Sequence, residues 1–187
     1  MEVVPTAYLG PASYYKLLRE GAQVEVMESY EKQTFRNRCL IESKVESRKS
    51  KDESREPREA IRLTVPVKKS EHKQLTRDVE VSYQTRWQHQ HWMALVSSYE
   101  HTPFFQYYAD YLRPWYEKET KWLVDLNDGL SSVILDLMDN QYPRTQRAIP
   151  HTTDWSGLTW TDRHPWQQER SILELLFEYG NETIAML

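Results

Sequence analysis

The chain has 187 residues, and 24 lysine and arginine residues stand against 28 aspartate and glutamate residues, for a formal net charge of -4. This balance argues against a general attraction to nucleic acid or to an anionic membrane, so any anion-binding site must be local. No apolar run approaches the roughly 20 residues of a membrane-spanning helix. The single cysteine, Cys39, cannot form an intramolecular disulfide, and the N-terminus lacks a signal-peptide pattern. We therefore expect one cytoplasmic domain over residues 1–187.

The first 28 residues predict a strand, a helix and a second strand. Met1–Ala7 reads as a short strand, and apolar residues at helical spacing follow from Tyr14 to Leu18, before Gly21. Alternation in Val24–Val26 indicates the second strand. The helix begins near Pro11, and its start would point backbone N–H groups at an anion.

Alternation of side chains from Lys32 to Ile41 predicts a third strand. One face would carry Lys32, Thr34, Arg36, Arg38 and Leu40, with Phe35, Cys39 and Ile41 turned to the core. Leu63–Val67 and Val79–Tyr83 also alternate, which predicts a sheet of four or five strands. Residues 42–59 are densely charged with almost nothing apolar, so we expect a mobile loop there.

Beyond Thr85 the apolar period becomes helical. Trp92–Tyr99 and Leu123–Met138 form amphipathic patterns, and Ser171 begins a third one that ends at Gly180. Residues 141–168 show no clear period and read as an irregular surface segment. The sequence therefore predicts an α/β protein with an N-terminal mixed sheet, a strand-helix-strand start and a helical C-terminal half.

Several ordered stretches resemble the WbqC-like family, particularly its members from Bacteroides-type bacteria. These stretches are Thr6–Pro11 with Ser13–Tyr15, Tyr30–Cys39, Leu63–Val67, Trp87–His91 with Tyr99 and Thr102–Phe105, and Ser171–Phe177. Residues 42–59 and 141–168 depart from the family pattern. The resemblance implies a link to O-antigen or other surface-polysaccharide (lipopolysaccharide) biosynthesis, where transfer of glycine or another small acyl group has been suggested. It brings no catalytic residues with it, so the candidate sites below come from residue chemistry.

The predicted third strand suggests an anion site. Arg36 and Arg38 would project from one face about 7 Å apart, a spacing that suits a phosphate or carboxylate held by two guanidinium groups. Lys32 would extend the positive strip, and Tyr8 and Tyr14 would flank the ligand and stack on a base or sugar. The alternatives are a solvated strand face paired with glutamates and, for the tyrosines, packing in the core.

His91 is the candidate general acid or base, because imidazole titrates near neutral pH. Trp87 lies one helical turn earlier and would face the same ligand; the alternative is a structural, partly buried histidine. His89 and His91 would point about 200° apart on a helix, so we expect no metal site. No sequence motif indicates a cofactor. The inward register of Cys39 argues against a nucleophilic thiolate.

Three hypotheses follow. The leading one is an enzyme that transfers an acyl or aminoacyl group, such as glycine, to a sugar nucleotide, with Arg36 and Arg38 holding an anion and His91 handling the proton. The second is a non-catalytic module that binds a sugar nucleotide or a partner protein with the same basic strip. The third is a scaffold in which part of the aromatic cluster from Phe104 to Tyr116 forms a homodimer surface, although packing between helices explains most of that cluster.

Overall fold

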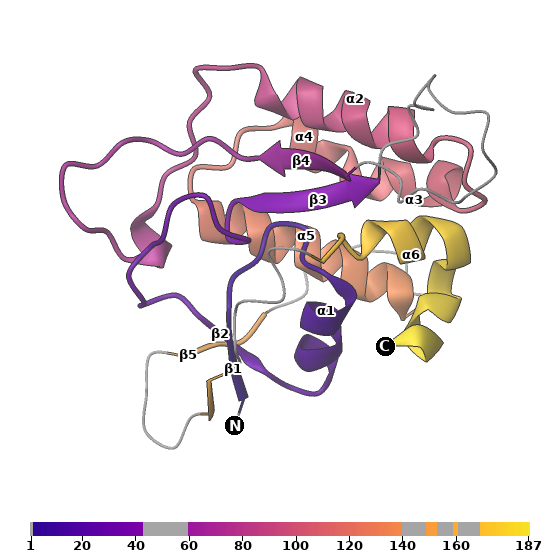
Figure 1. Ribbon diagram of the computed structural model, residues 1–187, viewed down its shortest axis with the longest axis horizontal. Coiled ribbons are helices and arrows are strands. Elements are labelled where there is room, and N and C mark those ends of the chain that lie inside the picture. The colour runs from indigo at the N-terminus through magenta and orange to yellow at the C-terminus, as the bar shows by residue number, and fades with distance from the viewer. Residues whose placement is uncertain (1, 43–59, 140–148, 153–158, 161–168) are drawn as a thin grey trace, which may run out of the picture.

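The structure is a computed structural model that describes residues 2–42, 60–139, 149–152, 159–160 and 169–187 (Figure 1). The segment expected to be a mobile loop, 42–59, lies outside these residues beyond Glu42. The described residues therefore include the N-terminal region, the helical region up to Asp139 and the C-terminal segment.

The strand-helix-strand start is confirmed. Strand β1 (Glu2–Pro5) leads through helix α1 (Ala12–Arg19) to strand β2 (Gln23–Glu25), and the two strands pair in parallel. The turn after α1 places Gly21 at a φ of 93°, which glycine adopts without strain.

Two further parallel strands join this sheet from a segment that the sequence had suggested was irregular. Strand β5 (His151–Thr152) pairs with β2, and strand β6 (Thr159–Trp160) pairs with β1, giving the order β5-β2-β1-β6. The interpretation of 141–168 as irregular throughout is therefore wrong. Each of these strands has only two residues, too few to produce a readable alternation.

The third and fourth strands form a separate antiparallel hairpin. Strand β3 (Arg38–Glu42) pairs with strand β4 (Ala60–Thr64), and neither joins the parallel sheet. The predicted strand from Lys32 was too long, since residues 32–37 form turns and a bend. The predicted strand Val79–Tyr83 makes only isolated bridges, from Val81 to Val67 and from Glu80 to Trp122.

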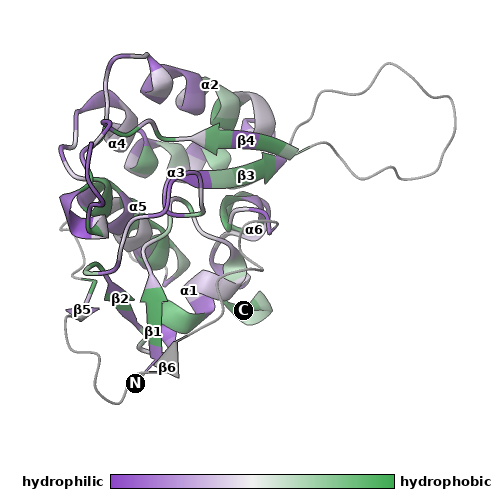
Figure 2. Cartoon of the chain, turned by 60° about the vertical axis from the view of Figure 1, so that its left-hand side comes forward, coloured by the Kyte–Doolittle hydropathy of each residue, from purple (hydrophilic) through white to green (hydrophobic). Residues whose placement is uncertain are grey.

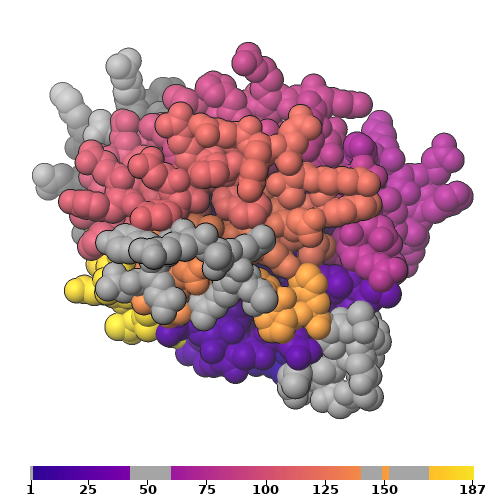
Figure 3. Space-filling view, turned by 180° about the vertical axis from the view of Figure 1, so that it is seen from behind, coloured from indigo at the N-terminus to yellow at the C-terminus, as the bar shows by residue number. Residues whose placement is uncertain are grey.

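Helices dominate the chain after the hairpin, and the expected α/β class with a helical C-terminal half is confirmed. The helical elements are η1 (Thr76–Asp78), α2 (Trp87–Tyr99), α3 (Phe105–Leu112), α4 (Pro114–Glu117), α5 (Leu123–Met138), α6 (Leu173–Tyr179) and η3 (Gly180–Met186). In the described residues, no helix is both long and apolar enough to cross a bilayer. Figure 3 shows the face behind the hairpin, where the segment from α3 to α5 lies above the N-terminal residues.

Apolar side chains from every layer meet between the hairpin, α2 and α5, and Figure 2 shows hydrophobic residues along β1, β3, β4 and α5. The aromatic cluster mainly packs between helices, as expected: Phe105 and Tyr116 are buried, and Phe105 meets Phe177 of α6 with ring centroids 5.1 Å apart. Each fully buried ring contributes roughly 1.5–3 kcal/mol. Tyr107 is the exception, with 71% of its surface exposed.

The C-terminal segment is bound to the N-terminal half through its backbone. Ser171 N–H donates to the carbonyl of Leu40 on β3 at 2.8 Å, and Ile172 N–H donates to Gly10 at 2.9 Å. These bonds hold the start of α6 against the hairpin.

Candidate functional site

The β3–β4 hairpin has a buried inner side and an accessible outer side. Alternation turns Cys39 and Leu63 into the core, where both are buried. The outer side carries Arg38 and Leu40 from β3 and Arg62 from β4; Arg62 is exposed and the other two are half-buried. The register pairs Leu40 with Arg62, so Arg38 and Arg62 are diagonal neighbours on one face.

Arg38 and Arg62 line a pocket of ≈ 170 Å³. Its other lining residues are Gln33, Thr34, Phe35, Cys39 and Leu40. Nη1 of Arg38 donates to the carbonyl of Gln33 at 3.3 Å, whereas its buried Nε has no hydrogen-bond partner. Within the described ranges, neither arginine forms an ion pair with a carboxylate. Among the residues that the structure describes, the pocket therefore presents two guanidinium charges that no carboxylate neutralises.

Arg36 lies elsewhere, which corrects the expectation that it shares a strand face with Arg38. It sits in the turn before β3, is fully buried, and donates from Nε and Nη2 to Oε1 of Glu28 at 2.7 and 2.5 Å. Its Nη1 donates to Oγ1 of Thr34 at 3.2 Å. The guanidinium is thus engaged by protein groups. Lys32 is exposed in the same turn and is not among the residues lining the pocket.

Tyr8, Trp87 and His91 do come together, but inside the core. Nδ1 of His91 lies 2.8 Å from the Tyr8 hydroxyl, which lies 3.0 Å from the hydroxyl of Tyr116. The imidazole of His91 also interacts with the backbone of Thr64 on β4. Tyr8 therefore links His91 to Tyr116 in a buried chain of hydrogen bonds. The rings of Trp87 and His91 meet edge to face, with centroids 5.1 Å apart.

This buried chain keeps His91 neutral. Desolvation lowers the pKa of His91 to about 4, against a smaller opposite effect of the Thr64 carbonyl. Burial, with a smaller effect of Tyr116, raises the pKa of Tyr8 above its ordinary value. None of Tyr8, Trp87 and His91 lines the arginine pocket, so the expected convergence of His91 with the arginines is wrong.

Tyr14 also lies in the core rather than beside an open loop. It is 1% exposed, and its ring packs edge to face on Tyr15 at 5.4 Å between centroids. A Cβ at Gly10 would lie 2.7 Å from the Tyr14 ring, so the turn before α1 needs glycine there. Burial raises the pKa of Tyr14, which keeps its hydroxyl protonated.

A model of the WbqC-like protein family matches residues 8–156. The chain belongs to the WbqC-like protein family. No curated protein and no solved structure matches it. The matched range of this WbqC-like protein includes the hairpin, the arginine pocket and the buried hydrogen bonds that link His91, Tyr8 and Tyr116.

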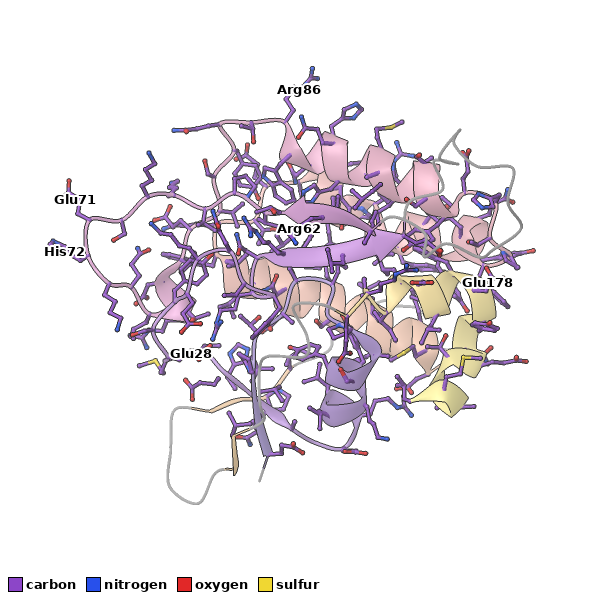
Figure 4. The ribbon with its side chains drawn as sticks, in the orientation of Figure 1. Glu28, Arg62, Glu71, His72, Arg86 and Glu178 are labelled. Carbon is purple, nitrogen blue, oxygen red and sulfur yellow. The ribbon has the colours of Figure 1, made fainter. Side chains whose placement is uncertain are left out.

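Sequence reasoning missed Arg62, although a signal for it was present. Leu63, Val65 and Val67 were recognised as one alternating face, and the same period places Arg62 on the other face, toward solvent. What the sequence could not supply is the pairing of β4 with β3, which brings Arg62 beside Arg38. In Figure 4, Arg62 lies over the hairpin, Glu28 lies below it, and Arg86 lies at the start of α2.

The described part of this WbqC-like chain contains no group of three or more His, Cys, Asp or Glu side chains arranged to hold a metal ion. Cys39 is buried, and desolvation raises the pKa of its thiol, which disfavours the thiolate needed for nucleophilic attack. Arg38 and Arg62 are therefore the described side chains best suited to hold a ligand.

Proposed function

We propose that this chain binds the anionic group of a small molecule, of the sugar-nucleotide class, in the pocket of Arg38 and Arg62. The observation that carries the proposal is the pair of guanidinium groups on one face without carboxylate partners among the described residues. Arginine holds phosphate or carboxylate oxygens through two parallel N–H bonds.

The volume of the pocket limits what it holds. Sites that enclose a whole drug-sized ligand measure about 300–1,000 Å³. The pocket of ≈ 170 Å³ suits one charged group, and the rest of the ligand would lie over the outer face of the hairpin. Thr34 and Gln33 offer polar contacts at the rim, and Phe35 offers an apolar one.

Transfer of an acyl group or glycine in cytoplasmic surface-polysaccharide synthesis is the finer proposal, and it rests on the family membership. The enclosed position of His91 argues against it as the base of that reaction, because the ring is buried and its Nδ1 hydrogen-bonds the Tyr8 hydroxyl. The geometry therefore supports anion binding at Arg38 and Arg62 better than it supports catalysis with His91 as the base.

A thermal-shift screen against nucleotide sugars and acyl or aminoacyl donors tests the binding proposal, since a ligand that binds the native state raises its Tm. A charge-assisted hydrogen bond contributes about 1.5–3 kcal/mol, so Arg38→Ala or Arg62→Ala should weaken the ligand at least about tenfold. Arg86→Ala is the control, because Arg86 is exposed and does not line the pocket. Equal binding by all three variants would reject the site.

Incubating a confirmed ligand with acyl and aminoacyl donors tests transfer itself. If His91 were the base, His91→Gln would bind the ligand and lose turnover. We expect no such selective loss.

A further inference from the structure

The outer face of β3 continues past the arginine pocket to a pair of carboxyl groups. Glu42, at the end of β3, lies 3.3 Å from Nη1 of Arg170 through its Oε1. The same Nη1 lies 3.2 Å from Oε1 of Glu174, on α6. One guanidinium nitrogen therefore joins two carboxyl groups from different elements.

Because both carboxyl groups lie within 3.3 Å of one guanidinium nitrogen, they are close neighbours, and the interaction of Glu174 with Glu42 includes a side-chain hydrogen bond. An ionised carboxylate can only accept hydrogen bonds, so such a bond requires a proton on one of the two groups. Burial and then the charge of Glu42 raise the pKa of Glu174, and Arg170 opposes them. Glu42 is the enclosed member, with 6% of its side chain exposed, and Glu174 is the accessible one, with 31% exposed.

The neighbouring backbone fixes the pair in place. The Glu42 N–H lies 3.3 Å from the hydroxyl of Tyr99 on α2, and Ser171 N–H donates to Leu40 beside it on β3. Among the described residues, the ionisable groups that contact the pair include Arg170 from the C-terminal segment and Tyr99 from α2. Burial raises the pKa of Tyr99, so its phenol stays neutral and adds no charge.

The pair lies on the same strand face as the pocket. Arg62 faces Leu40, so Arg38 and Glu42 are its two diagonal neighbours on β3. With a rise of about 3.3 Å per residue, Glu42 lies roughly 7 Å along β3 from the level of Arg62. An anion held by Arg62 would therefore act electrostatically on the pair.

We propose that Glu42 and Glu174 form a proton-sharing clasp that fastens α6 to β3, and that the clasp makes anion binding at Arg38 and Arg62 depend on pH. The pH dependence of anion binding rests on the proposed function, whereas the clasp itself does not. A bound anion favours the protonated clasp, and by reciprocity protonation of the clasp favours the anion.

The clasp itself is tested by stability against pH in wild type, Glu174→Gln and Glu178→Gln. A carboxyl whose pKa is raised by folding stabilises the fold fully at low pH, and this contribution is lost as pH rises through the folded pKa. From about pH 5 to about pH 8, the wild-type Tm should fall roughly 2–4 °C further than that of Glu174→Gln, whose amide keeps a neutral donor. Glu178 is exposed on α6, and its variant should follow wild type (Figure 4).

Carbon-13 titration of the wild-type carboxyl groups gives the same answer without a variant. Glu174 should titrate above ordinary glutamate, and its resonance should respond to the titration of Glu42. Parallel stability profiles in wild type and Glu174→Gln, or independent ordinary titrations, would overturn the clasp.

Sulfate is the probe for the coupling, since it stays doubly negative across this pH range. Two charges acting over roughly 10 Å in water amount to about a two- to fourfold change in affinity. Amide chemical shifts measure the affinity for sulfate. From about pH 5 to about pH 8, the affinity of wild type and of Glu178→Gln should fall about two- to fourfold more than that of Glu174→Gln. The same pH dependence in Glu174→Gln would overturn the coupling. If Arg62→Ala binds sulfate with the same affinity as wild type, the proposed pocket is rejected, whereas the interaction of Glu42 with Glu174 is unaffected by that result.

Discussion

Arg36 and the pair formed by Arg38 and Arg62 show two uses of arginine within one short region. Arg36 is fully enclosed and gives two hydrogen bonds to the Glu28 carboxylate. Arg38 and Arg62 line an accessible pocket, and no carboxylate of the described residues pairs with them. A buried guanidinium that is already neutralised holds a turn together, whereas an accessible one without a carboxylate is available to a ligand.

The contacts of Arg36 also explain why the turn before β3 takes its shape. Arg36 anchors it from within through Glu28, and Nδ2 of Asn127 on α5 donates to the Arg36 carbonyl at 2.9 Å. Nδ2 of Asn37 donates to the carbonyl of Val65 at 2.9 Å, which ties the turn to the chain beyond β4. This anchored turn supplies Gln33, Thr34 and Phe35 to the pocket. The enclosed arginine therefore supports the pocket without lining it.

The largest effect is expected for Arg36→Met. Removing one member of a buried ion pair leaves the Glu28 carboxylate in a dry environment, which costs about 3–5 kcal/mol of unfolding free energy. Urea denaturation at neutral pH measures this loss, with Arg86→Met as the exposed control. A loss below about 1 kcal/mol would mean that Arg36 is not the anchor described here.

A double variant measures the coupling energy between Glu28 and Arg36 apart from the other contacts of each side chain. Glu28→Gln combined with Arg36→Met removes both charges, so the combined loss should be smaller than the sum of the single losses by about 0.5–3 kcal/mol. Additive losses would contradict the coupling between the two side chains.

A second, smaller effect concerns the buried histidine beneath the hairpin. The folded pKa of His91 is lowered to about 4, below the ordinary value of 6.5, so the folded state binds fewer protons than the unfolded chain. Its contribution is present above about pH 6.5 and is lost as pH falls toward 4, up to roughly 3 kcal/mol. Denaturation profiles of wild type and His91→Gln over this range measure it. Profiles of equal slope would show that His91 is not held neutral.

The smallest effect is expected for Arg62→Ala in the absence of ligand. Its side chain is exposed and has no ion-pair partner among the described residues, so the unfolding free energy should change by less than about 0.5 kcal/mol. A large loss in the same denaturation experiment would place Arg62 with Arg36, as a structural residue.

Local patterns predicted much of the fold and little of the site. The strand-helix-strand start, α5 and the glycine at the end of α6 follow from periodicity and backbone conformation, and Gly180 indeed has a positive φ of 59°. Alternation around Arg36 was misleading, because turn residues also alternate in composition without forming a strand. The partner of Arg36, Glu28, and the position of Arg62 beside Arg38 depend on contacts between distant segments, which a single sequence does not specify.

The burial of His91 likewise depends on side chains that are distant in the sequence. Trp87 and His91 fall one turn apart on α2, as predicted, but Tyr8 and Tyr116 close over the ring from other elements. Residue chemistry indicated a group able to transfer protons. Only the surrounding contacts showed that the ring is buried and that its Nδ1 hydrogen-bonds the Tyr8 hydroxyl.

The most direct test of the account is calorimetric titration of one nucleotide sugar, chosen from the screen, into wild type, Arg62→Ala and Arg86→Ala. We expect Arg62→Ala to bind at least about tenfold more weakly with an unchanged Tm, and Arg86→Ala to bind as wild type does. Wild-type affinity in Arg62→Ala would contradict the central claim that the outer face of the hairpin holds the anionic group.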